Sequence, residues 1–279
     1  MTTYIARASI DRASFGTDWE TWHATHETNR ADPHGLLAIT GLHFLTGVAQ
    51  RLTDTPGSWT DTPTGPVVDL TDTEQLTIDG ETVTGIRFEF GDIAERDGRL
   101  ATAGDAVIEV ARRGGHIVVR PRHPDNAYLG AYPGTPTYPP NPRWRVAARF
   151  QAFIEPREVT VGASVEGLQH VYEAPGQLEF DYRGETFTLT AFNGHTPGAL
   201  FVLFTDATSG ITTYAANRSV SVAAPDADGL TTIDFNRATN LPCAYTDYAT
   251  CPLPPTENRL PIGIEAGEKT PLTRNTASL

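Results

Sequence analysis

Residues 106–122 read AVIEVARRGGHIVVRPR, and this stretch indicates the fold class of the chain. Two short runs, 106–112 and 116–122, are rich in valine and isoleucine and flank Arg113-Gly114-Gly115. Runs of this kind on either side of a glycine pair are typical of an antiparallel hairpin, because a tight turn needs residues that tolerate positive φ. The sequence therefore predicts two paired strands joined at these glycines.

Short apolar or alternating runs, separated by Gly, Pro and Asp, continue on both sides of this hairpin. They predict strands at 36–40, 66–70, 75–78 and 83–90, and at 143–150, 159–161, 169–173, 177–182, 185–192, 200–205, 212–222, 231–235 and 261–266. Tyr182-Arg183-Gly184-Glu185 joins two of these runs and predicts a second hairpin. Strands at such regular, short spacing are typical of a sandwich or a barrel.

One helix is predicted near the N-terminus. Ser14 or Thr17 can cap it, and Asp32-Pro33 and Gly35 follow its last residue, Asn29. The side chains that recur at helical spacing between these limits are Trp19, Trp22, His23 and His26. We therefore expect an all-β fold with one N-terminal helix.

A proline-rich stretch, residues 124–143, divides the chain. Proline lacks a backbone donor and fixes φ, so this stretch is expected to form neither a helix nor a central strand. We place a domain boundary or a long crossing loop there, which fits the two domains that a length of 279 residues indicates. Residues 1–140 would form the helix and a small β-sandwich, and residues 141–279 a larger antiparallel sandwich or barrel.

Composition narrows the class of partner. The net charge of −13 argues against nucleic acid, whose phosphates need a basic face. No apolar run approaches the roughly 18 residues of a membrane span, and the N-terminus has no apolar signal segment, so we expect a cytoplasmic protein that does not bind membranes. No nucleotide-binding glycine motif is present, so the cofactor is left open, as is the oligomeric state.

Several segments together resemble one family. They are DPHGLL (32–37) with GLHFL (41–45), RWRVAARF (143–150), FTDATSG (204–210) continuing through Tyr214 to Arg218, DFNRA (234–238), NLPCAY (240–245), ATCPLPP (249–255), ENRLP (257–261) and IEAGEK (264–269). On these segments the chain resembles the DUF1684 family. The resemblance implies a β architecture in two parts and implies no activity.

Charged residues inside apolar runs of the second half are the main candidates for a site. A buried charge is costly unless it is paired, so they form either an arginine–carboxylate network that fixes the core or a site for acid/base chemistry and anion binding. We expect a pocket in or beside the second part. The catalytic candidates are Asp206, Asp234, Glu265 and Glu268, and the substrate-binding candidates are Arg143, Arg145, Ser209, Tyr214, Arg218, Asn236, Arg237 and Asn240.

Metal ligands are a weaker possibility. His34 and His43 lie in the family-like segments, and Cys243 and Cys251 each lie beside a proline with seven residues between them. That gap is wider than the usual zinc spacing, so the cysteines are interpreted as buried thiols or as a loop-closing disulfide.

Three hypotheses for function follow. The first is an enzyme that acts on a small anionic molecule through an arginine–carboxylate pocket. The second is a non-catalytic module that binds a small molecule or a phospho-ligand, and the third is a metal-dependent enzyme with His or Cys ligands.

Overall fold

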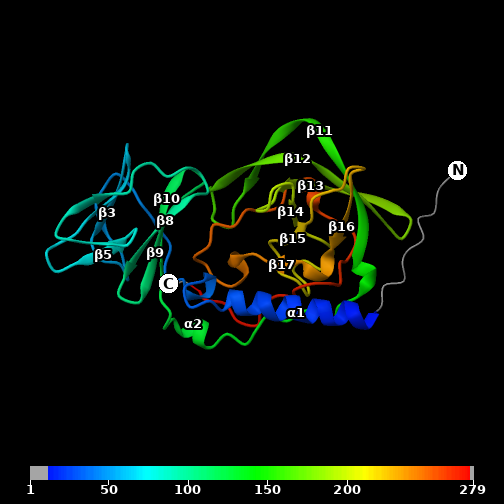
Figure 1. Cartoon of the computed structure of the whole chain (residues 1–279), viewed down its shortest axis with the longest axis horizontal. Helices are drawn as coiled ribbons and strands as arrows, with labels where there is room; N and C mark the ends of the chain where they lie inside the picture. The colour runs from blue at the N-terminus through cyan, green and yellow to red at the C-terminus, as the bar shows by residue number, and fades with distance from the viewer. Residues whose placement is uncertain (1–11, 277–279) are drawn as a thin grey trace.

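The computed structural model describes residues 12–276 and is built mainly of β-strands with one long helix, as the sequence predicted (Figure 1). Its strands form three sheets, in which every named ladder is antiparallel. Two of the sheets belong to residues 43–122, and the third belongs to residues 145–240.

The first two sheets enclose one apolar core. The six-stranded sheet has the order β1-β10-β9-β8-β5-β6, with β1 (His43–Phe44), β5 (Gln75–Ile78), β6 (Glu81–Thr84), β8 (Gly98–Ala103), β9 (Ala106–Arg113) and β10 (His116–Arg122). The four-stranded sheet has the order β2-β3-β4-β7, with β2 (Gln50–Arg51), β3 (Ser58–Thr62), β4 (Gly65–Asp69) and β7 (Arg87–Glu89). Trp59 and Val68 of the smaller sheet pack with Leu76, Ile108 and Val119 of the larger one, and all five are buried.

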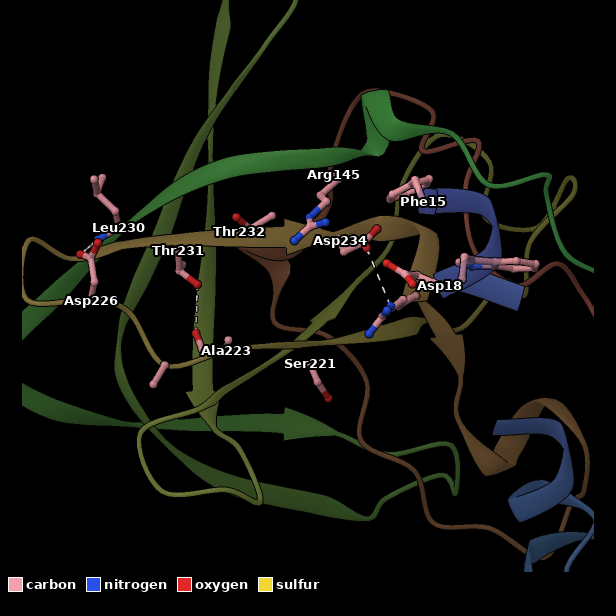
Figure 2. Close-up of a pocket in the computed structure, with 13 residues that line it drawn as sticks. Phe15, Asp18, Arg145, Ser221, Ala223, Asp226, Leu230, Thr231, Thr232 and Asp234 are labelled. Carbon is pink, nitrogen blue, oxygen red and sulfur yellow. Dashed lines mark hydrogen bonds and ion pairs between the residues drawn. The ribbon is translucent and has the colours of Figure 1, made fainter. Parts of the chain in front are cut away.

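The third sheet curls into a barrel-like shape. Its order is β16-β11-β12-β13-β14-β15-β17, with β11 (Arg145–Gly162), β12 (Gln169–Tyr182), β13 (Glu185–Asn193), β14 (Leu200–Phe204), β15 (Arg218–Val222), β16 (Leu230–Asp234) and β17 (Thr239–Asn240). The first strand in this order returns toward β15, where the Thr231 hydroxyl donates to the Ala223 carbonyl at 3.0 Å (Figure 2). The curled sheet encloses a second core, in which Leu178, Phe204 and Phe235 are fully buried.

Both predicted hairpins are confirmed. Arg113 pairs with His116, and Tyr182 pairs with Glu185, so each turn has two residues at its tip. Those residues have positive φ, 58° and 81° at Gly114 and Gly115 and 54° and 85° at Arg183 and Gly184. The turn chemistry therefore fixed the register of both hairpins.

Helix α1 (Arg12–Arg30) lies along the curled sheet, at the bottom of Figure 1. The Trp19 indole donates to the Asn236 carbonyl at 2.8 Å, which ties the helix to the second core. The predicted end of the helix is one residue short, whereas the predicted caps are wrong. Ser14 and Thr17 lie inside the helix, which already includes Arg12.

Several local predictions are wrong for identifiable reasons. Residues 36–40 contain a short 3₁₀ helix, η1 (Leu36–Ala38). Residues 261–266 form no strand, and the carbonyls of Ile264 and Ala266 accept from an arginine side chain described below. The proline-rich stretch contains one helical turn, α2 (Ala127–Gly130), which the Asn126 side chain caps. Strand β15 begins at Arg218 rather than at residue 212, and residues 83–90 form two strands rather than one.

The remaining short helices lie before, between and after the strands of the second part. They are η2 (Pro142–Trp144), η3 (Phe235–Arg237), η4 (Pro242–Ala244) and η5 (Thr256–Asn258). The first of them delays the predicted 143–150 strand until Arg145, because the Asn141 side chain accepts from the Arg143 amide and caps a turn. The division into domains at residue 140 remains a prediction.

Candidate functional site

The predicted site residues do not converge on one cavity. Some of them pair in the interior of the second part, and others lie apart on its surface. Asp234, Arg145 and Arg237 line one surface groove, Asp206 and Ser209 line a second, and Arg143 and Glu265 line a third.

Arg218 and Asp206 form a fully buried ion pair. The Arg218 Nη2 donates to the Asp206 Oδ2 at 2.5 Å, and both side chains are at most 1% exposed. The same guanidinium donates to the backbone carbonyls of Ile264, Ala266 and Glu268. Because these carbonyls have a charged donor, this segment needs no strand partner, and Arg218 holds it in place.

Asp206 also closes the turn that follows it. Its Oδ1 accepts from the Thr208 amide at 2.7 Å and from the Thr208 hydroxyl at 2.5 Å, while the Ser209 hydroxyl accepts from the Asp206 amide at 3.1 Å. These bonds are those of a structural turn. Both carboxylate oxygens accept from protein groups, and the side chain is 0% exposed, so a ligand does not reach it.

Glu268 is the centre of a second buried network. Its Oε1 accepts from Arg30 of helix α1 at 2.6 Å, and its Oε2 accepts from the Asn240 amide at 2.6 Å and from the Tyr245 hydroxyl at 3.2 Å. Burial favours the neutral acid, but the His26 and Arg30 side chains outweigh it and lower the pKa of Glu268. This network joins the N-terminal helix to the C-terminal segment of the fold.

A groove of about 390 Å³ lies where the curled sheet meets the start of helix α1 (Figure 2). We call it the α1 groove. It is lined by Phe15, Asp18, Trp19, Arg145, Ser221, Ala223, Ala224, Asp226, Leu230, Thr231, Thr232, Asp234 and Arg237. The groove exists because β15 and β16 approach each other without forming a ladder, so that side chains rather than backbone bonds line the space between them.

Asp234 is held at one end of the α1 groove. Its Oδ1 accepts from the Asn236 amide at 3.1 Å and from the Asn236 side chain at 2.9 Å, which caps helix η3. Its Oδ2 is 3.9 Å from the Nε of Arg237, whose guanidinium lies over the Trp22 ring at 5.4 Å. One carboxylate oxygen is therefore fixed by the fold, and the other faces a single, distant charge.

Arg145 lies opposite Asp234 in the β11–β16 ladder, and its side chain is exposed. Figure 2 shows its guanidinium beside Asp234 and Thr232, on the groove side of β16. Within residues 12–276 it has neither a hydrogen bond nor an ion pair. Asp18 of helix α1, which Figure 2 shows next to Asp234, is likewise without a partner in this range.

Asp226, the third aspartate that lines the groove, has a structural role. Asp226 accepts from the backbone amides of Asp228 and Leu230 at 2.9 and 2.8 Å and closes the β15–β16 connection. Among the charged side chains of the groove, Arg145 and Asp18 have no partner within residues 12–276, and Arg237 and the Asp234 Oδ2 have only their mutual contact at 3.9 Å and the Trp22 ring.

The remaining predicted residues lie elsewhere. Glu265 was expected inside an apolar strand, but its side chain is exposed and lies near Arg143, beside Pro139, Pro140 and Pro142. Asn236 is buried behind the α1 groove, where its side chain exchanges two hydrogen bonds with the backbone of Asn141. The Tyr214 hydroxyl donates to the Cys243 carbonyl at 2.8 Å.

No cluster of three or more metal-binding side chains occurs in the described part of the chain. His34 bonds the Asp105 carbonyl at 2.8 Å, and burial lowers the pKa of His43. Cys243 and Cys251 are buried free thiols rather than a disulfide, and the Cys243 amide donates to the Cys251 Sγ at 3.1 Å. Among residues 12–276, no helix is long and apolar enough to cross a membrane.

Sequence reasoning missed the contribution of helix α1. Asp18 and Trp19 reach the α1 groove only because the helix docks on η3, far away in sequence. The helical spacing of Trp19 and Trp22 was visible, but nothing in it indicated which surface the helix would cover.

Comparisons with known proteins found a family model and solved structures to which parts of this chain are similar. The family model described as "Protein of unknown function (DUF1684)" matches residues 130–269. A solution NMR structure of an uncharacterized protein from Haloarcula marismortui is 33% identical, covering 52% of this chain and 80% of that chain, with a TM-score of 0.43. Among curated proteins, none matches this chain.

Proposed function

Because the chain belongs to the DUF1684 family, whose function is unknown, we propose a role from its own residues: it binds a small anionic molecule in the α1 groove. The observation that carries this proposal is the unpartnered Arg145 guanidinium in the wall of the groove. A guanidinium presents a planar fork of donors that matches a carboxylate or a phosphate. Arg237 also lines the groove, and its guanidinium makes no hydrogen bond to residues 12–276. It can therefore donate a second hydrogen bond to the anionic group of the ligand.

The acidic side chains of the groove restrict the ligand further. Asp18 and the Asp234 Oδ2, which lies 3.9 Å from the Arg237 Nε, can accept hydrogen bonds and repel a purely anionic molecule. A ligand that fits both sets of groups carries its anionic group toward Arg145 and a hydroxyl or amino donor toward the aspartates. A hydroxy acid or an amino acid has this pattern, and a groove of about 390 Å³ accommodates such small molecules.

An enzyme that acts on this molecule is the second candidate, and Asp234 carries it. Asn236 orients the carboxylate through Oδ1 and leaves Oδ2 to exchange a proton with the donor group of the ligand. Asp206 and Glu268 are poor candidates for that step, because ion pairs and turn bonds occupy their oxygens. If the protein is an enzyme that acts on a small anionic molecule, Asp234 is therefore the candidate general acid or base.

The test is a thermal-shift screen of hydroxy acids, amino acids and small phosphate esters, followed by calorimetric titration of the compounds that stabilise the wild-type protein. Arg145→Gln is expected to weaken the binding of these compounds at least tenfold, because one charge-assisted bond contributes about 1.5–3 kcal/mol. Arg143→Gln is the matched control, since Arg143 is also exposed but lies outside the α1 groove.

Asp234→Asn separates binding from catalysis. If the protein is an enzyme, this variant should keep the ligand and lose turnover of it. Equal affinity of wild type and Arg145→Gln for every compound would contradict the proposed site.

A further inference from the structure

A second group of arginines lies on the outer face of the first sheet, far from the α1 groove in the fold. Glu109 of β9 is opposite Arg120 of β10, Arg113 is four residues further along β9, and Arg122 is two residues beyond Arg120. Since side chains alternate along a strand, all four point to the same side. We call these four residues the Glu109 cluster.

One carboxylate serves three guanidiniums in this cluster. Glu109 Oε1 accepts from Arg113 at 3.0 Å and from Arg120 at 2.7 Å, and Oε2 accepts from Arg120 at 3.1 Å and from Arg122. Burial favours the neutral acid, but Arg120 and Arg122 outweigh it and lower the pKa of Glu109 to about 2. With Glu109 ionised, the cluster retains an excess of two positive charges.

These charges are largely withdrawn from water. The side chains of Glu109, Arg120, Arg113 and Arg122 are 8%, 11%, 18% and 23% exposed. The Nε of Arg122 is buried and has no acceptor among residues 12–276. Burial and the neighbouring Arg120 lower the pKa of Arg113, as expected where like charges are not neutralised. A protein with a net charge of −13 thus keeps a concentrated positive site.

The second part of the molecule covers one side of the cluster. The Gly114 backbone packs so closely on the start of β12 that a Cβ there would be 2.6 Å from the Gln169 carbonyl oxygen. Further along β12, the Tyr172 ring lies under the Arg96 guanidinium at 4.8 Å, and the charge of Arg113 acts on its hydroxyl. That hydroxyl makes no hydrogen bond to any described residue.

The other acidic groups nearby do not cancel the excess charge. The Glu95 side chain accepts from the amides of Gly114 and Gly115 at 2.7 and 2.9 Å, so the hairpin turn holds it. The charge of Glu95 acts on Arg113, but the Arg96 guanidinium over the Tyr172 ring adds one positive charge, so that counting both residues leaves the excess at two.

We propose that the Glu109 cluster and the Tyr172 hydroxyl form a binding site for a doubly charged tetrahedral oxyanion, namely a phosphate group. An excess of two positive charges matches the charge of a phosphate at neutral pH. Guanidinium forks and a phenolic hydroxyl are suitable donors to phosphate oxygens. The site is independent of the α1 groove and joins the first sheet to β12.

The test is calorimetric titration of the full chain with inorganic phosphate and with phosphoserine, at constant ionic strength. Saturable binding of either compound, with much weaker binding of acetate and chloride, is expected. Tighter binding of phosphoserine would indicate a phosphate attached to a larger molecule, and tighter binding of inorganic phosphate would indicate the free ion.

Two variants should weaken phosphate binding, Arg113→Gln at least tenfold and Tyr172→Phe several-fold. Glu109→Gln should strengthen it, because the variant removes the carboxylate that pairs with all three arginines. Since that variant also loses its internal salt bridges, phosphate should raise its unfolding temperature more than that of the wild type.

Arg87→Gln, which alters an exposed ion pair with Asp69 in the same part, is the control and should not change phosphate affinity. If phosphate does not bind the wild type saturably, or if it binds Arg113→Gln, Tyr172→Phe and Glu109→Gln with unchanged affinity, the proposed site is refuted.

Discussion

Arg218 and the Glu109 cluster both bury guanidinium groups, but they satisfy them differently. Arg218 has one carboxylate and three carbonyls around its two terminal nitrogens, so its single charge is balanced within the fold, although its buried Nε has no acceptor among residues 12–276. In the Glu109 cluster, Arg113 and Arg122 also donate to backbone carbonyls, but three guanidinium charges share one carboxylate. The first arrangement fixes the position of the chain, whereas the second leaves capacity for an external anion.

The largest difference between the two regions should come from removing the carboxylate. Asp206→Ala leaves the Arg218 charge buried without a partner, and we expect a loss of about 3–5 kcal/mol in the free energy of unfolding. Denaturant unfolding measures this value. In phosphate buffer the loss should persist, because the space around Arg218 is filled by protein carbonyls. Recovery of stability in phosphate would show that the two regions behave alike.

Glu268→Gln tests the other balanced network with a smaller change. The amide keeps the shape of the side chain but loses the charge that accepts from Arg30 and the Asn240 amide. We expect a loss of about 2 kcal/mol, in the range for hydrogen bonds to charged groups. Tryptophan fluorescence during unfolding measures it. Glu257→Gln is the control and should change stability little, because Glu257 is exposed and accepts only from the Thr190 hydroxyl among the described residues.

Acidification should affect the unbalanced cluster in a defined pH window. The pKa of Glu109 is about 2 in the folded protein, against an ordinary value of 4.5. The stability that this carboxylate contributes is present above pH 4.5 and is lost as the pH falls toward 2, because the unfolded chain takes up the proton first. The wild type should lose about 1–2 kcal/mol more across this window than Glu109→Gln.

Unfolding titrations of both proteins at several pH values check this difference. Other carboxylates, such as Glu74 with a pKa also lowered to about 2, contribute equally to both proteins. Parallel pH curves for the two proteins would mean that the arginines do not hold Glu109 ionised.

Arg145→Gln should give the smallest effect on stability. Its guanidinium is exposed and has no partner among the described residues, so the free energy of unfolding should stay within about 0.5 kcal/mol of the wild type. A larger loss, measured by denaturant unfolding, would place Arg145 with Arg218 as a structural residue.

Local rules predicted those parts of the fold that depend on local chemistry. The glycine turns at Gly114 and Gly184 determined both hairpins and their registers. Residues 261–266 looked like a strand from their apolar content, but their carbonyls bond to Arg218, and such a contact between distant residues leaves no local pattern.

The candidate sites likewise divide into features that local sequence predicts and features that depend on contacts between distant residues. Asp234, Arg145 and Arg237 were recognised as charged residues beside apolar strands, but their grouping with Asp18 depends on how α1 docks. The grouping of the Glu109 cluster on one face of the sheet could have been predicted from the sequence. Once the hairpin turn at Gly114-Gly115 is predicted, counting back along both strands places Glu109 opposite Arg120 and on the same face as Arg113 and Arg122.

The docking of α1 has a consequence for the synthesis of the chain. The Trp19 indole bonds a carbonyl 217 residues later, and Arg30 bonds a carboxylate 238 residues later. During translation the helix therefore leaves the ribosome long before its partners exist, and such distant contacts form late in folding. A ribosome that stalls before Glu268 would hold a nascent chain in which the aromatic face of the helix remains exposed to chaperones.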